Sequence, residues 1–144
     1  MILILAAALL FPACLASAET LTGKVLAVTD GDTVTVLSPQ NEQNKIRLAD
    51  INAPKKAQAF GQRSKEKMSD LVFGKVSIAD KDAGLALVLA GLAWHYKKYE
   101  KEQSPTDRER YAAAEVRART TRVGLWAAAD SVPPWEWRAE RRGK

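Results

Sequence analysis

The sequence predicts a small α+β domain in which a β-hairpin leads and helices pack behind it. Two observations predict this class: apolar residues alternate on both sides of an Asp-Gly pair near the start, and most later segments carry helix signals. The chain has 144 residues, which suits one domain with one modest core. A hairpin-led barrel with helices packed on it fits this order of elements.

The first eighteen residues have the composition of a secretory signal peptide. They carry no charged side chain and end in Ala16-Ser17-Ala18, a small-x-small cleavage pattern. The apolar part is short for a membrane span, although an uncleaved anchor is the alternative. We therefore expect a signal peptide at 1–18, a domain at 19–144, and a secreted or periplasmic protein. Cleavage would remove Cys14, the sole cysteine, and leave the domain without disulfides.

The strand signals come early in the chain. Residues 22–37 alternate apolar and polar side chains around Asp30-Gly31, and Asp-Gly between β-rich runs is a strong hairpin signal. A third strand is expected at 45–51, and Pro54 follows its end. Together with a short strand at 75–79, this is a low strand count for a closed barrel.

Three helices are expected. The first spans 60–73 and stops at Gly74, and the second spans 85–99, where the run LALVLAGLAW predicts burial. The third begins after the N-cap Ser104 and runs over 105–124. The tail is broken by prolines, and three tryptophans are expected to anchor it: Trp126, Trp135 and Trp137.

The positive charge is concentrated in two parts of the chain. The net charge is +5 overall, and residues 45–75 alone hold eight Lys or Arg against three acids. Residues 97–144 hold twelve basic and eight acidic residues. Such a basic surface favours a polyanion such as nucleic acid, or it simply keeps the protein soluble.

Polar residues at the hairpin and the third strand are candidates for a site. Asp30 and Asp32 flank Gly31, and they serve either as turn formers or as ligands of a hard cation such as calcium. Arg47 lies inside an apolar strand and needs a partner, because its planar fork matches phosphate or carboxylate.

The segment AWHYKKY has two interpretations. His95, the sole histidine, is expected to be structural rather than an acid or base, which makes a Ser-His-Asp triad improbable. Tyr96 and Tyr99 lie beside two lysines, so they either stack on nucleobases or pack in the core.

Several motifs together resemble the staphylococcal-nuclease-like (thermonuclease) family. They are TGKVLAVTDGDTVTV, KIRLADINAPKKAQAFGQRSKEKMSDLVFGK, AGLAWHYKKY, RYAAAEVRARTTRVGLW and PPWEWR, and they cover nearly all of the chain after the signal segment. The resemblance implies an oligonucleotide-binding-type β-barrel with packed helices. It also implies calcium-dependent hydrolysis of DNA and RNA phosphodiesters, without sequence preference, by a monomer.

The family's site carries over to this chain only in part. The resemblance implies a metal ligand at Asp32, a backbone carbonyl ligand at Ala53 and a phosphate-binding Arg47. Asn52 stands where the family has a second metal-binding aspartate. Lys55 stands at the position of its general-base glutamate.

A segment of the family pattern is also missing. The family has a Tyr-Gly-Arg stretch, whose arginine clamps the phosphate, followed by a further strand; here GKVSIADKD runs almost directly into AGLALVLAGLAW. The barrel is therefore expected to be incomplete. The expected nucleic-acid contacts are Lys55, Lys56, Tyr96 and Tyr99.

These departures leave three hypotheses open. The domain is a calcium-dependent nuclease with some activity left, helped by a stand-in ligand such as Asp50. Alternatively, it is a non-catalytic nucleic-acid-binding domain on the same scaffold, or a truncated product that barely folds because a sheet edge is open. An ammonium cannot accept a proton from water, so losing the base at Lys55 is expected to lower the rate by about 10²–10⁴-fold.

Overall fold

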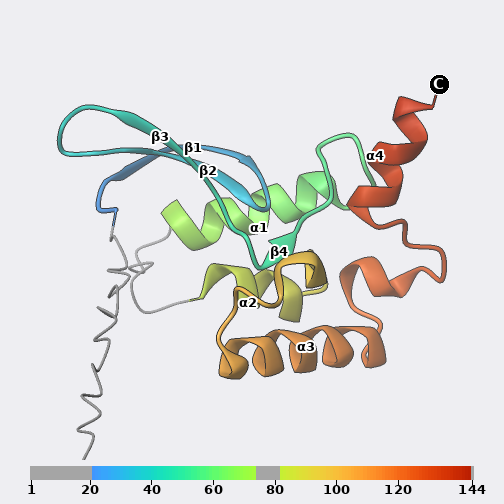
Figure 1. Ribbon diagram of the computed structural model, residues 1–144. Helices are drawn as coiled ribbons and strands as arrows, with labels where there is room; N and C mark the ends of the chain where they lie inside the picture. Colours follow the sequence, from blue (N-terminus) through green and yellow to red (C-terminus); the bar gives the residue numbers. More distant parts are fainter. Residues whose placement is uncertain (1–20, 74–81, 144) are drawn as a thin grey trace, which may run out of the picture.

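The computed structural model describes residues 21–73 and 82–143 (Figure 1). These residues form two small antiparallel sheets and four α-helices, which confirms the α+β class. The expected signal peptide at 1–18 and the short strand expected at 75–79 lie outside the described residues. Among those described, no helix has the length and apolar character needed to cross a membrane.

A three-stranded sheet is built on the expected hairpin. Strands β1 (Lys24–Asp30) and β2 (Thr33–Leu37) pair antiparallel, and β3 (Gln43–Arg47) pairs with the other side of β2. Thr33 lies opposite Arg47, so the turn after β1 and the end of β3 meet at one end of the sheet. Within the described part of the chain this sheet stays open, in agreement with an incomplete oligonucleotide-binding-type barrel.

The turn between β1 and β2 requires a glycine because a helix packs directly against it. A Cβ atom at Gly31 would lie only 1.9 Å from the hydroxyl oxygen of Ser64, a buried residue of α1 (Gly61–Phe73). The hydroxyl of Ser64 in turn donates a hydrogen bond to the carbonyl of Leu92 (2.8 Å). The turn is thus held at a fixed distance from the helical layer.

The expected third strand is divided in two. It ends as β3 at Arg47, where the backbone N–H of Leu48 donates to the carbonyl of Asp32 (2.8 Å) and the chain bends. The next two residues in strand conformation, β4 (Ile51–Asn52), pair instead with β5 (Trp94–His95). The second sheet therefore brings the AWHYKKY segment beside the turn that follows Asn52.

The second expected helix is much shorter than predicted. Helix α2 (Ala83–Leu89) ends before Gly91, whose φ of +65° is left-handed, and the N–H of Leu92 closes the end by donating to Leu87 (2.9 Å). Because this glycine stops the helix, Trp94 and His95 lie in a strand and not on a helix. A single turn of 3₁₀-helix, η2 (Lys97–Tyr99), follows.

The remaining helices complete the second layer of the molecule. Helix α3 (Pro105–Thr120) begins as expected, with the Ser104 hydroxyl accepting the N–H of Asp107 (3.1 Å), and it packs beneath α2 (Figure 1). The tail forms the turn η3 (Gly124–Ala127) and a fourth helix, α4 (Pro134–Arg142), which the proline pattern did not predict. Buried residues from the sheet, α1 and α2 share one core, among them Val28, Val34, Ile51, Met68, Leu87 and Val88.

Candidate functional site

Asp32 is the buried centre of a polar cluster at the end of the hairpin. Its side chain is fully buried, and its carboxylate accepts the backbone N–H of Ala53 and the hydroxyl of Thr33, both at 2.8 Å. Asp30 lies beside it and accepts the N–H of Asp32 (3.3 Å). The hairpin turn and the residue after β4 therefore fix two carboxylates side by side.

The ammonium group of Lys55 lies between these carboxylates. Its Nζ is 2.9 Å from Asp30 Oδ2 and 3.2 Å from Asp32 Oδ1. Pro54 lies two residues beyond the end of β4 and is fully buried. Lys55 follows it, and its side chain reaches back to the carboxylates at the hairpin turn. The side chain is only 24% exposed, which makes this contact a partly buried ion cluster rather than a surface salt bridge.

Arg47 completes the cluster from the end of β3. Its Nη2 is 3.6 Å from Asp32 Oδ2, and its guanidinium carbon lies 5.9 Å from the ring centre of Tyr96. The side chain, which carries five N–H donors, is 41% exposed. A phosphate group approaching this end of the sheet would meet these donors.

The two carboxylates of the cluster differ in proton affinity. Burial raises the pKa of Asp32, and the neighbouring Asp30 adds to that rise, while Lys55 opposes it. For Asp30 burial acts in the same direction, but hydrogen bonds with Asp32 and Lys55 outweigh it and hold the pKa below its usual value. Lys55 thus stabilises the negative charge that the turn concentrates here.

The cluster does not fit the calcium ion that the family resemblance implies. Calcium takes six to eight oxygen ligands, usually with several carboxylates. Within the described residues no three His, Cys, Asp or Glu side chains gather into a group that could hold a metal, so Asp50 does not join Asp30 and Asp32 in such a group. The positive charge between Asp30 and Asp32 is supplied by Lys55, which would repel a cation at that point.

Asn52 has an unusual environment for an amide. The residue is fully buried in β4, and neither its amide oxygen nor its amide nitrogen has a hydrogen-bond partner within the described residues. A buried amide left in this way costs about 1–3 kcal/mol of stability. The residue offers one neutral oxygen, where the family resemblance implies a charged ligand.

The other expected contact residues lie around this cluster. Tyr96 is half-buried beside Arg47, and its ring meets that of Tyr99 edge to face at 5.4 Å. Lys56 is exposed and lies next to the start of α1. His95 is buried and its Nε2 shares a hydrogen bond with Gln103 (2.9 Å), which supports the structural role expected for it.

Two residues at the site have roles that the sequence did not predict. Asp30, expected as a turn former or a metal ligand, pairs directly with Lys55. Trp135 of α4 lies against Tyr96, with ring centres 5.8 Å apart. The sequence indicated only that this tryptophan anchors the tail, because no local pattern shows which surface the tail reaches.

Comparison with known proteins gives consistent matches. A family profile described as staphylococcal nuclease homologue matches residues 72–128. An uncharacterized endonuclease of Haemophilus influenzae is 36% identical, with 88% of this chain and 78% of that protein covered. A micrococcal nuclease of Shigella flexneri is 34% identical, with 81% and 79% covered, and a staphylococcal-like nuclease of Arabidopsis thaliana is 30% identical, with 75% and 39% covered.

Proposed function

Because the chain belongs to the family of staphylococcal nuclease homologues, we propose that it binds DNA or RNA without sequence preference and that its phosphodiester hydrolysis is weak or lost. The family membership supports nucleic acid as the partner, since the relatives are named nucleases and endonucleases. The proposal about catalysis rests on the residues of this chain.

The position of Lys55 is the observation that carries the proposal. Its ammonium is a donor only, so it cannot take the proton from an attacking water molecule. It also lies 2.9 Å from Asp30 and 3.2 Å from Asp32, where its positive charge offsets one of the two negative charges and weakens the attraction that a divalent cation would find there. Lys55 would therefore deprive the reaction of its general base and would also weaken calcium binding.

Phosphate binding, in contrast, is supported by the same cluster. Arg47 makes one long contact to Asp32 (3.6 Å), and its side chain is 41% exposed. The stretch 45–75, which contains it, has a net charge of +5. Cations that neutralise phosphates without base contacts give binding that is independent of sequence and sensitive to salt.

A weak calcium-dependent nuclease is the second candidate. It is favoured by the retention of Asp32 and Arg47 in contact with each other, since these are the residues to which the resemblance assigns metal and phosphate binding. In this case a residual reaction would proceed at a rate far below that of relatives with a carboxylate at position 55.

One experiment separates the two candidates. Purified protein is incubated with labelled single-stranded DNA and RNA, with calcium or with a chelator, and both cleavage and a mobility shift are recorded. We expect a salt-sensitive shift without cleavage. Cleavage that needs calcium and disappears in Asp32→Ala would instead establish the weak nuclease, and a lack of any shift at low salt would contradict the proposed function.

We further propose that residues 1–18 are an export signal and that residues 19–144 act as a secreted or periplasmic monomer. The absence of charge in the first eighteen residues and the Ala16-Ser17-Ala18 pattern support export. N-terminal sequencing of exported protein would test this, with Glu19 as the expected first residue. Light scattering would test the monomer.

A further inference from the structure

Gln58 connects the turn that carries Lys55 to the C-terminal tail. Its side-chain oxygen accepts the backbone N–H of Lys55 (3.3 Å), and its side-chain nitrogen donates to the carbonyl of Val132, just before α4. An N–H group needs an oxygen and a carbonyl needs a donor, so these two partners fix the orientation of the amide. One side chain therefore bridges two segments that lie far apart in the sequence.

The backbone of Gln58 also shapes this turn. Its N–H donates to the carbonyl of Lys55 (2.8 Å), and its carbonyl accepts the N–H of Gly61 at the start of α1 (2.9 Å). A Cβ atom at Gly61 would lie only 2.0 Å from the carbonyl oxygen of Lys55, so the turn packs closely against the helix. Gln58 thus holds both the N–H and the carbonyl of Lys55.

The chain between Gln58 and α1 is strained. Phe60 has a φ of +63°, a left-handed conformation that a bulky residue rarely adopts. Such a conformation persists where the surrounding structure holds it. The tail is part of that surrounding structure, because both segments line one hollow of about 250 Å³: Ala57, Ala59 and Phe60 from the turn, and Leu125, Val132 and Trp137 from the tail.

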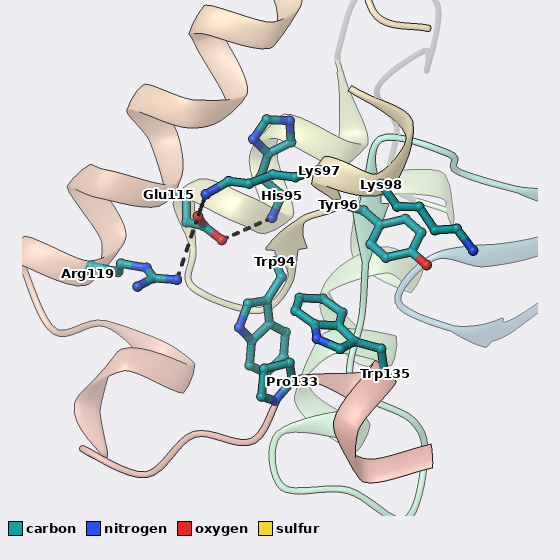
Figure 2. A pocket seen from close by; sticks show the side chains of 9 residues that line it. All are labelled: Trp94, His95, Tyr96, Lys97, Lys98, Glu115, Arg119, Pro133 and Trp135. Atoms are coloured by element: carbon teal, nitrogen blue, oxygen red, sulfur yellow. Dashed lines mark hydrogen bonds and ion pairs between the residues drawn. The ribbon is translucent and has the colours of Figure 1, made fainter. Parts of the chain in front are cut away.

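The tail is itself anchored to the body of the domain. Figure 2 shows Pro133 and Trp135 beside Trp94, and the two indole rings meet edge to face with centres 6.4 Å apart. Pro134 is fully buried. Val132 directly precedes these residues, so the carbonyl that Gln58 binds belongs to an anchored segment.

We infer that Gln58 is a positioning residue through which the docked tail holds Lys55 between the two carboxylates of the hairpin turn. The ammonium lies 2.9 Å from Asp30 and 3.2 Å from Asp32 only while the backbone of the turn keeps its place. When the tail leaves, the turn loses its tie, the lysine moves out, and the two carboxylates lose the charge that compensates them. Tail docking therefore controls the charge at this end of the sheet, whether or not nucleic acid binds there.

The test is the rate at which acetic anhydride acetylates Lys55 in the full chain, measured by mass spectrometry that distinguishes it from Lys56. An ammonium held by two carboxylates must leave them and lose its proton before it reacts. The net contribution of one hydrogen bond corresponds to roughly a three- to tenfold change. We expect acetylation of Lys55 to be about three- to tenfold faster in Gln58→Ala, with the rate at the exposed Lys56 unchanged. A wild-type rate at Lys55 would refute the inference.

Gln58→Glu separates the two hydrogen bonds of the side chain. Its carboxylate can still accept the N–H of Lys55 but cannot donate to the carbonyl of Val132. Lys55 should therefore be acetylated as fast as in Gln58→Ala. A wild-type rate in Gln58→Glu would show that the turn does not need the tail, and the coupling would be overturned.

A tail variant and a matched control complete the experiment, with every protein kept well below its melting temperature. Trp137→Ala removes a tail side chain from the shared hollow and leaves the turn unaltered, so faster acetylation of Lys55 is again expected. Gln62→Ala is the control, because this exposed glutamine bonds to Glu66 (2.9 Å), and it should keep the wild-type rate. An unchanged rate in Trp137→Ala, or equal acceleration in Gln62→Ala and Gln58→Ala, would contradict a role for the tail.

Discussion

Lys55 is a single side chain that changes the chemistry of the whole cluster. A carboxylate at this position would add a third negative charge beside Asp30 and Asp32, whereas the ammonium offsets one of the two negative charges that are already there. Removing one partner of such a buried cluster is costly, because the remaining charges lose their compensation. Lys55 therefore stabilises the turn by compensating part of its negative charge.

Restoring carboxylates at positions 52 and 55 should make the stability of the protein depend on calcium. We expect the double variant Asn52→Asp/Lys55→Glu to be less stable than the wild type without calcium, because four carboxylates then crowd one turn. Calcium at ten times its dissociation constant should return about 1.4 kcal/mol of stability. Thermal unfolding with and without calcium measures both effects.

The control for this prediction is Lys56→Glu, which makes the same charge change as Lys55→Glu but at an exposed neighbour. It should show no calcium response. A wild-type protein that gains as much stability from calcium as the double variant would contradict the role given to Lys55.

The break between α2 and β5 decides which elements border the site. Had the apolar run continued as a helix, Trp94 would not pair with Asn52, and the N–H of Tyr96 would not donate to the carbonyl of Asp50 (2.9 Å). The chain turns at Gly91, which adopts a left-handed conformation and lies close to Val123. The carbonyl of Gly91 accepts the N–H of Leu125 (2.8 Å). One glycine thus sets where the β4–β5 sheet forms, and with it the positions of Trp94 and Tyr96.

Gly91→Ala should therefore be destabilising. The new Cβ atom would lie 2.2 Å from the carbonyl oxygen of Val123, and the φ of +65° is itself unfavourable for alanine. We expect a loss of about 1–3 kcal/mol, or more where the contact cannot relax. Gly143→Ala is the control, because its Cβ atom would meet nothing closer than 3.9 Å. Urea denaturation compares the two, and equal stabilities would contradict the argument.

Helices α2 and α3 are joined by a hydrogen bond that depends on pH. Burial raises the pKa of Tyr111 well above its usual value of about 10, and its hydrogen bond to Asp82 (2.6 Å) adds to the rise. The folded protein then keeps a proton that the unfolded chain releases, so stability is full below pH of about 10 and falls above it.

Tyr111→Phe should remove this part of the pH dependence. Above pH of about 10, the wild type should lose up to about 1.4 kcal/mol per pH unit more than the variant. Urea denaturation at a series of pH values measures the difference, and the other tyrosines cancel because both proteins contain them. Parallel stability curves for the two proteins would show that Tyr111 ionises equally in both states.

At the scale of the whole molecule, the basic groups converge although they are separate in the sequence. Arg47 ends β3 and Lys55 follows β4, while Lys97 and Arg119 line a neighbouring pocket between β5, α3 and the start of α4. A chain of phosphates running from one to the other would release counterions along its path. Binding should therefore weaken steadily with salt, whatever the base sequence.

Arg47→Ala should reduce that salt dependence. If the guanidinium neutralises one phosphate, the slope of log affinity against log salt concentration becomes smaller by about one. Lys24→Ala is the matched control, because this exposed lysine begins β1 at the opposite end of the hairpin. Titrations with single-stranded DNA at several salt concentrations measure the slope, and an unchanged slope in Arg47→Ala would contradict phosphate binding there.

The sequence by itself determined the α+β class, the hairpin at Asp30-Gly31, the N-cap of α3 and the family. These features depend on neighbouring residues, through alternation, turn chemistry and capping, or on motifs that can be read in order. It also showed that Asn52 and Lys55 depart from the family pattern, because a substitution is visible without coordinates.

Only the tertiary structure decided what those substitutions do. That Lys55 bridges Asp30 and Asp32, and that Trp135 lies against Tyr96, depends on contacts between residues far apart in the chain. No local pattern predicts such distances, since they result from how the sheet, helices and tail pack together. The end of α2 before Gly91 was unpredictable for the same reason. The apolar pattern fits a longer helix, and only the packing of Gly91 against Val123 shows why the chain turns there.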